Sequence, residues 1–355
     1  MKKFIIIRKG CLSVIYEKRT MLIVLFSLII AIFSILFSLS IGQKNIPISK
    51  VIQILLSLDN SSDSIIVNTL RLPRTLVAFF VGASLGLSGA ILQGVIKNPM
   101  ADPNIIGLTD SGSVGALLFL TLFTDPKNNA LTTSIFYMPT FAFAGSFLAV
   151  ILVYFLAFKK GVTPYRLIMI GIAISGAAKA LTSILIINGP LIFIKESQLW
   201  ITGTVYGTNW THVKLLSIWF LFLFILTIIF IKELNIQNLD DSISTGLGSS
   251  VEKNRFILMI ISAGLASGAV AVGGAISFIG LIAPHISKKL TNSNFENIIP
   301  LSTLIGGIIV VLSDILARTL FFPQDLPVGI FTAGIGAPFF IYLLIKNQKT
   351  LRRGI

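Results

Sequence analysis

Long apolar stretches recur along the whole chain, and they constrain its fold more than any other feature. The segment 21–41, for example, contains no charged residue. Lipid offers a backbone no hydrogen-bond partners, so an apolar run of about 20 residues crosses a bilayer as a helix. Charged residues make up only 12% of the chain, whereas a soluble domain carries about 25%. The sequence therefore predicts an all-α polytopic membrane protein.

About ten segments have the length and composition of membrane-spanning helices. They are 21–41, 75–96, 105–123, 135–158, 165–187, 212–232, 255–272, 274–290, 298–318 and 327–346. The glycine-broken stretch GGAISFIG lies between the seventh and eighth segments. A nine-span alternative fuses or omits one of these segments. We expect a single transmembrane domain over residues 21–346.

The basic residues indicate the orientation of this domain. With the N-terminus inside, 19 of the 28 lysines and arginines fall on the inner side and 7 on the outer side. Cytoplasmic loops carry such an excess of positive charge. We therefore expect a cytoplasmic N-terminal segment (1–20) and a cytoplasmic basic tail (347–355). The run 21–41 is too long for a signal-peptide core, and we expect it to be a retained first helix.

Two arginines contradict this rule. Arg71 and Arg74 stand in the sequence RLPR directly before the second apolar segment, and the charge count places them outside. Arg318, at the end of the ninth segment, also falls on the outer side. Because topology does not account for these charges, another role is needed.

Several functional classes are disfavoured. The net charge of +14 is spread between apolar segments and forms no single basic patch, so membrane topology explains it better than nucleic-acid binding. The chain has no phosphate-loop motif, no H-E-x-x-H, no C-x-x-C and no cluster of metal ligands. Its one cysteine, Cys11, excludes an internal disulfide. We expect no enzyme activity, no metal and no cofactor.

Ionisable residues inside apolar segments are candidates for function, and three are considered in turn: Asp314, Asp110 and Lys179. Asp314 precedes Arg318 by four residues, which favours an ion pair on one helix face over proton coupling. Asp110 lies in the glycine-rich third segment, and Lys179 lies in the fifth.

Three stretches of the sequence resemble a known family. The first is RLPRTLVAFFVGASLGLSGAILQGVIKNPMADPNIIGLTDSGSVGA, which begins at Arg71. The others are GGAISFIGLIAPHISKKL (273–290) and IPLSTLIGGIIVVLSDILART (299–319) followed by LPVGIFTAGIGAPFFIYLL (326–344). They resemble the signature of the FecCD-type permease family, which comprises membrane subunits of ABC importers for ferric siderophores, haem and vitamin B12. The resemblance covers nearly everything after residue 45.

The resemblance implies ten helices and a transport assembly in the cytoplasmic membrane of a bacterium. A second permease subunit, identical or related, would share the translocation path. Two ATP-binding cassette subunits and an extracellular or periplasmic binding protein would complete the importer. The expected cargo is a ferric siderophore, with B12 or haem as alternatives within the family. A secondary transporter driven by an ion gradient is the alternative from another class.

The resemblance also implies roles for particular residues. Arg71, Arg74 and Arg318 would pair with glutamates of the binding protein, since a guanidinium binds a carboxylate in two places. Lipid-headgroup contact or anchoring of the helix end is the alternative. Lys179 would line the translocation path, with snorkelling or a structural ion pair as alternatives.

A polar segment on the inner side would couple the chain to the ATPase. This segment covers about 233–253 and is mixed in charge. A solvated polar connector is the alternative. The residues expected to make the contact are Asp240, Asp241, Ser244, Gly246, Leu247 and Gly248.

Overall fold

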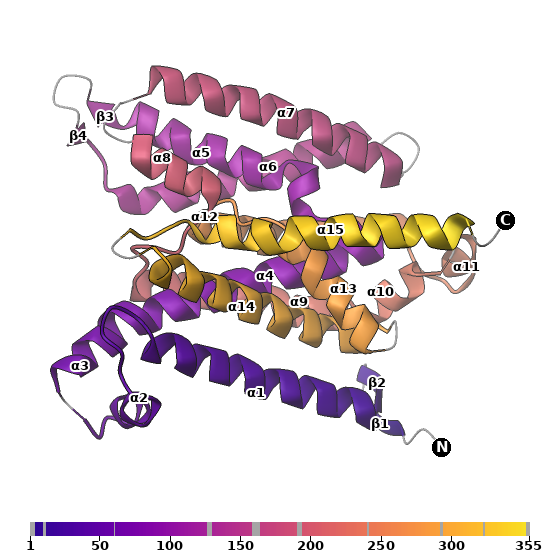
Figure 1. Cartoon of the computed structure of the whole chain (residues 1–355). Helices are drawn as coiled ribbons and strands as arrows, with labels where there is room; N and C mark the ends of the chain where they lie inside the picture. Colours follow the sequence, from indigo (N-terminus) through magenta and orange to yellow (C-terminus); the bar gives the residue numbers. More distant parts are fainter. Residues whose placement is uncertain are drawn as a thin grey trace.

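The computed structural model is a bundle of helices whose two termini lie at the same end (Figure 1). It describes residues 4–9, 12–59, 61–125, 130–157, 164–189, 194–239, 241–291, 294–321 and 324–352. Helix α1 forms one flank of the bundle in this view, and helix α7 forms the opposite flank.

The helices have the following bounds in chain order. They are α1 (Lys18–Ser40), α2 (Ile48–Leu55), α3 (Ser62–Ile65), α4 (Leu72–Ile96), α5 (Leu108–Leu122), α6 (Met138–Ala157), α7 (Pro164–Asn188), α8 (Ile194–Thr202), α9 (Trp210–Ile229), α10 (Ile231–Gln237), α11 (Asp241–Gly246), α12 (Val251–Gly273), α13 (Ile279–Leu290), α14 (Phe295–Thr319) and α15 (Val328–Arg352). A π-helix, η1 (Ile66–Arg71), leads into α4, and two 3-10 helices, η2 (Pro103–Ile106) and η3 (Ile135–Tyr137), precede α5 and α6.

The described residues are mostly helical, as expected, and they also include two short pairs of antiparallel strands. Strands β1 (Phe4–Lys9) and β2 (Leu12–Glu17) pair antiparallel, with Phe4 opposite Glu17 and Lys9 opposite Leu12. Both strands are rich in β-branched and aromatic residues, which favour an extended backbone. Strands β3 (Thr124–Asp125) and β4 (Ala130–Leu131) form a second, two-residue ladder.

Each of the ten predicted segments coincides with a helix, but the helices differ in their capacity to span a membrane. Among the described residues, seven helical stretches are long and apolar enough, and they include α1, α4, α6, α7, α9, α12 and α14. Helix α5 and the apolar part of α15 (Val328–Leu343) are shorter. Helix α13 has only 12 residues. It starts late because Gly274 and Phe278 both have a positive φ, which ends the helical path after α12.

Helix α4 lies in the core of the bundle, and glycines let its neighbours approach closely. Gly82 on α4 and Gly306 on α14 face each other so closely that a Cβ on either would overlap the backbone oxygen of the other. Gly89 on α4 meets the backbone of Gly280 on α13 in the same way. Small residues serve this purpose in membrane bundles because lipid provides no hydrophobic force between helices.

The contact between α4 and α14 gives a first prediction. Gly306→Ala should destabilise the protein by about 1–3 kcal/mol, since the added methyl group cannot fit against Gly82. Gly176→Ala is the matched control, because a Cβ at Gly176 on α7 meets nothing within 4 Å. Alanine favours a helix, so the control should be neutral or slightly stabilising. Thermal unfolding of the purified variants in detergent measures both, and equal midpoints would contradict the predicted close contact.

Candidate functional site

Arg71, Arg74 and Arg318 are brought together at the end of the bundle where α1 and α14 finish and α4 and α15 begin. We call this the arginine end. Arg71 closes the π-helix η1, and Arg74 lies in the first turn of α4. Arg318 lies in the last turn of α14. π-helical segments are rare and occur frequently at functional sites.

Arg71 binds the carbonyl groups at the end of α1. Its Nη1 donates to the oxygens of Leu39, at 2.7 Å, and Ser40, at 3.2 Å. Its Nη2 donates to the oxygen of Lys44 at 2.6 Å. The last carbonyls of a helix have no partner within the helix and carry partial negative charge. Arg71 is buried, and its guanidinium caps the C-terminus of α1.

Arg318 contacts the same helix end. Its Nη2 donates to the backbone oxygen and to the hydroxyl of Ser38, the latter at 2.8 Å. The Ser38 hydroxyl also shares a hydrogen bond of 2.8 Å with Thr75 of α4. The Nε of Arg318 lies 3.7 Å from Asp314 one turn earlier, as the spacing of these two residues predicts. Arg318 therefore joins α14 to α1.

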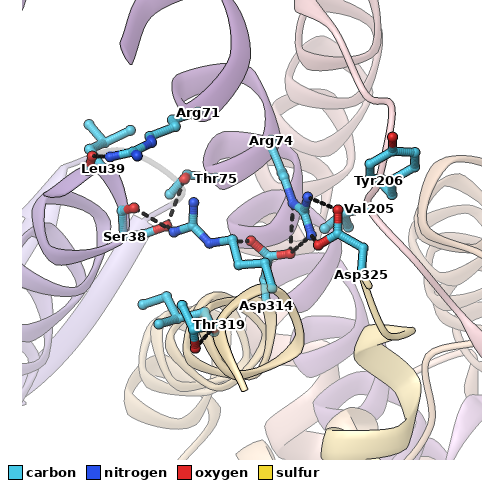
Figure 2. A network of polar contacts seen from close by, with 12 residues as sticks. Ser38, Leu39, Arg71, Arg74, Thr75, Val205, Tyr206, Asp314, Thr319 and Asp325 are labelled. Atoms are coloured by element: carbon cyan, nitrogen blue, oxygen red, sulfur yellow. Dashed lines mark hydrogen bonds and ion pairs between the residues drawn. The ribbon is translucent and has the colours of Figure 1, made fainter. Parts of the chain in front are cut away.

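Arg74 connects two aspartates and one aromatic ring (Figure 2). Its Nη2 lies 2.8 Å from Asp314, whose side chain is only 1% exposed. Its two terminal nitrogens each lie 3.3 Å from Asp325, whose side chain is 32% exposed. The guanidinium carbon is 5.7 Å from the centre of the Tyr206 ring, within the range of a cation–π contact. Arg74 thus links α4 to the segment before α15 and to the turn before α9.

A cavity of about 470 Å³ opens between these elements. All three arginines line it, together with Gly42, Gln43, Lys44, Ile66, Leu70, Tyr206, Gly207, Thr208 and Asp325. The three guanidiniums carry one more charge than Asp314 and Asp325 can neutralise. Such a cavity can accept a carboxylate group from a partner.

The family resemblance grouped the three arginines, and the structure places them around one cavity. Sequence reasoning missed Tyr206 and did not pair Asp325 with Arg74. Nothing in the sequence signals Tyr206, because its partner Arg74 lies more than a hundred residues away.

The predicted coupling residues lie at the opposite end of the bundle, on and around α11. Asp241 pairs with Lys97 at 2.7 Å and with Arg255 at 3.2 Å. The hydrogen bond from Lys97 lowers the pKa of Asp241 below its usual value. These two pairs fix α11 against the ends of α4 and α12. The Ser244 hydroxyl donates to the oxygen of Ile236 at 2.8 Å, so Ser244 points inward.

Other residues of this segment face outward. The Leu247 residue is 62% exposed, and Leu239 and Ile243, at spacings of four residues before it, are exposed too. Gly246 and Gly248 border open space, and Gly248 has a φ of +84° that favours glycine. Asp240 lies outside the described residues. The sequence prediction included Leu247 but neither Leu239 nor Ile243.

Lys179 lies apart from both ends, on α7. Its side chain is 69% exposed, and its Nζ is 3.8 Å from the Oδ2 of Asp110 on α5. The structural ion pair that the sequence left as an alternative is therefore present in a loose form.

The fold defines a multi-pass helical membrane protein. A model of the FecCD transport family matches residues 29–346. The siderophore transport system permease protein YfhA of Bacillus subtilis is 40% identical over 334 residues, which are 94% of this chain and 97% of that protein. The iron(3+)-hydroxamate import system permease protein FhuG of the same organism is 38% identical over 323 residues, which are 91% and 96%.

A solved structure has a similar fold. A structure described as a metal-chelate type ABC transporter in an inward-facing conformation has a TM-score of 0.79 and 29% sequence identity, and the match covers 91% of this chain and 99% of that chain. The chain belongs to the FecCD transport family.

The buried carboxylate at the arginine end gives a second prediction. Asp314→Asn should destabilise the protein by about 3–5 kcal/mol, because Arg74 and Arg318 lose a buried counter-ion. Asp325→Asn removes an exposed partner of the same Arg74 and should cost about 0–1 kcal/mol. Thermal unfolding in detergent compares the two variants. Equal destabilisation by the two substitutions would contradict the prediction that the burial of Asp314 makes its ion pairs costly to break.

Proposed function

We propose that the chain is the permease subunit of an ABC importer that carries a ferric siderophore across the cytoplasmic membrane of a bacterium. The match to the FecCD transport family over residues 29–346 is the observation that carries this proposal. Two relatives are described as permeases for siderophore and for iron(3+)-hydroxamate import, which supports an iron complex as cargo. Vitamin B12 and haem are the alternatives within the family.

ATP hydrolysis would be supplied by two separate subunits that bind the end of the bundle carrying α10 and α11. The exposed side chains of Leu239, Ile243 and Leu247 support this contact. Ile243 lies on α11 and the two leucines flank it, and exposed apolar side chains gathered at a well-anchored segment favour a partner surface. The ion pairs of Asp241 with Lys97 and Arg255 would transmit movement of α11 to α4 and α12. A second permease subunit completes the proposed path.

The binding protein would dock at the arginine end. The cavity there holds an excess of positive charge, which supports recognition of acidic side chains. Arg71 and Arg318 cap α1, so the structure gives Arg74 the greatest freedom to exchange a partner, through its exposed contact with Asp325. In this proposal an incoming glutamate competes with Asp325 for Arg74.

The two proposed contacts, with the ATPase and with the binding protein, imply an orientation of the chain in the membrane. Both chain termini lie at the same end as α10 and α11 (Figure 1). With the ATPase inside the cell, the segment 1–20 and the tail 347–355 are cytoplasmic and the arginine end is external. The excess of basic residues on that side supports the same orientation.

Reconstitution tests the proposed function against the alternative of a secondary transporter. The chain is placed in proteoliposomes with candidate ATP-binding cassette and binding proteins from the same organism, and uptake of radiolabelled ferric siderophore is followed. We expect uptake to need enclosed ATP and the binding protein, and to persist when ionophores collapse the ion gradients. Uptake by the chain alone, driven by an imposed gradient, would support a secondary transporter instead.

The coupling surface gives a third prediction. Leu247→Asp should lower ATP-driven uptake by at least about tenfold, because it places a charge in the proposed contact with the ATPase. Leu247→Met preserves an apolar side chain and should retain uptake. Co-purification of the ATPase with each variant shows whether the loss lies in assembly. Normal uptake by the aspartate variant would exclude Leu247 from the contact.

A further inference from the structure

An apolar groove of about 320 Å³ lies between α6, α9 and α12, separate from the arginine end. Its wall on α9 includes Trp219, Phe222 and Leu226, and its wall on α12 includes Phe256 and Ile260. The indole N–H of Trp219 is the one polar group among the side chains that line it. Water is not held well in such a space, because a buried water molecule needs several polar partners. The groove is therefore suited to a hydrocarbon ligand.

Glycines of α12 shape this groove. Gly264 lines it, and the Nε1 of Trp219 donates a hydrogen bond to the carbonyl oxygen of Gly264 at 2.9 Å. A Cβ at Gly268 would lie 2.7 Å from the same indole ring, so the ring can approach α12 this closely only beside a glycine. The polar group of the lining thus has its partner within the chain. A ligand in the groove meets only apolar side chains.

The groove opens on the outer surface of the bundle. Phe222 and Phe256 are 55% and 36% exposed, whereas Leu223 and Ile261, which also line the groove, are almost fully buried. Exposed side chains at the rim and buried ones at the floor describe a slot that faces away from the core. Helices α9 and α12 are both long and apolar enough to span a membrane. The slot therefore faces either lipid or another membrane subunit.

The side chains around the groove favour lipid. Helices that associate within a membrane do so through small residues and through hydrogen bonds between them. The rim instead carries phenylalanine, leucine and isoleucine, and the indole N–H is already used. The exposed face of α9 beside it is equally bulky, with Ile218, Leu221 and Ile225. This surface lacks the features by which membrane helices associate.

The length of the groove matches one leaflet of a bilayer. From Trp219 to Phe230 it follows α9 for about 16 Å. The hydrocarbon core of a bilayer is about 30 Å thick, so one leaflet occupies about half of that distance. Trp219 lies in the middle of α9, and Phe230 lies at the end that continues into α10. The groove therefore extends through the leaflet on the side of α10 and α11.

A lysine stands at the end of the groove where a lipid headgroup would lie. Lys253 precedes Ile257 and Ile260 on α12 at spacings that place the three on one helix face. Lys253 is exposed, and its neighbour Glu252 pairs with Arg255 at 3.4 Å. Basic residues between membrane helices at the cytoplasmic surface bind anionic lipid headgroups. Lys253 is therefore placed to contact a phosphate.

We propose that this groove binds one acyl chain of an anionic phospholipid, whose phosphate contacts Lys253. The assignment of the lipid to the cytoplasmic leaflet rests on the proposed function, whereas the binding site does not. The bound chain fills the space between α9 and α12. Because Arg255 of α12 pairs with Asp241 of α11, the lipid also supports the helix that anchors α11.

Native mass spectrometry of the purified full-length chain in detergent tests the site, with dioleoyl phosphatidylglycerol or dioleoyl phosphatidylcholine as the added lipid. We expect phosphatidylglycerol to bind more tightly. Ile260→Trp fills the groove and should weaken this binding by at least about tenfold, because buried CH₂ groups of the lipid lose their contacts. Leu226→Trp fills it from the opposite wall and should do the same. Ile225→Trp is the matched control, since Ile225 is exposed on α9 outside the groove and its replacement should change nothing.

The headgroup contact has its own variant. Lys253→Gln should weaken the binding of phosphatidylglycerol by about fivefold, because it removes one positive charge beside the phosphate. The binding of phosphatidylcholine should change less. Lys214→Gln is the control, because Lys214 is exposed near the opposite end of α9 and should affect neither lipid.

Equal affinities for the two lipids, or an affinity for phosphatidylglycerol that both tryptophan variants leave unaltered, would overturn the inference. A dimer that forms without lipid and is lost in Ile260→Trp would also overturn it, because a second subunit would then occupy the groove. Thermal midpoints without lipid show that each variant is folded. The measurement uses no ATPase, binding protein or cargo. Failure of ATP-driven uptake with normal lipid binding would therefore count against the proposed function alone.

Discussion

The arginine end depends on one buried carboxylate. Asp314, with its side chain 1% exposed, lies between Arg74 of α4 and Arg318 of its own helix. Removing one partner from a buried ion pair leaves an uncompensated charge, which costs far more than losing a surface pair. Through Arg318 and the carbonyl of Ser38, the same carboxylate holds α1 against α14. Three helices that are distant in sequence therefore share one electrostatic connection.

The three arginines contribute to the structure in two different ways. Arg71 and Arg318 satisfy carbonyl groups at the end of α1, so their first effect is on the fold. Arg74 reaches farther, to Asp325 before α15 and to Tyr206 before α9. A partner that engages Arg74 would act on two segments that are otherwise separate. Docking and the position of α15 would then be coupled through one guanidinium.

The sequence predicted the helices well because their signal is local. Apolar length located the ten segments, and the family resemblance grouped Arg71, Arg74 and Arg318. It did not predict that Arg71 caps α1, since a bond between residues 71 and 39 leaves no periodic pattern. The shortness of α13 depends on the positive φ of Phe278, a residue that rarely adopts it. Such features arise from tertiary packing.

Two charged clusters within the apolar helices differ in how tightly their charges are paired. A charge within lipid must be paired, and the quality of the pairing indicates its purpose. Asp314 is buried and lies 2.8 Å from Arg74, which is the geometry of a permanent structural contact. Lys179 is exposed and stands 3.8 Å from Asp110, which leaves its charge available. The contact of Asp314 therefore holds helices together far more firmly than the contact of Lys179 does.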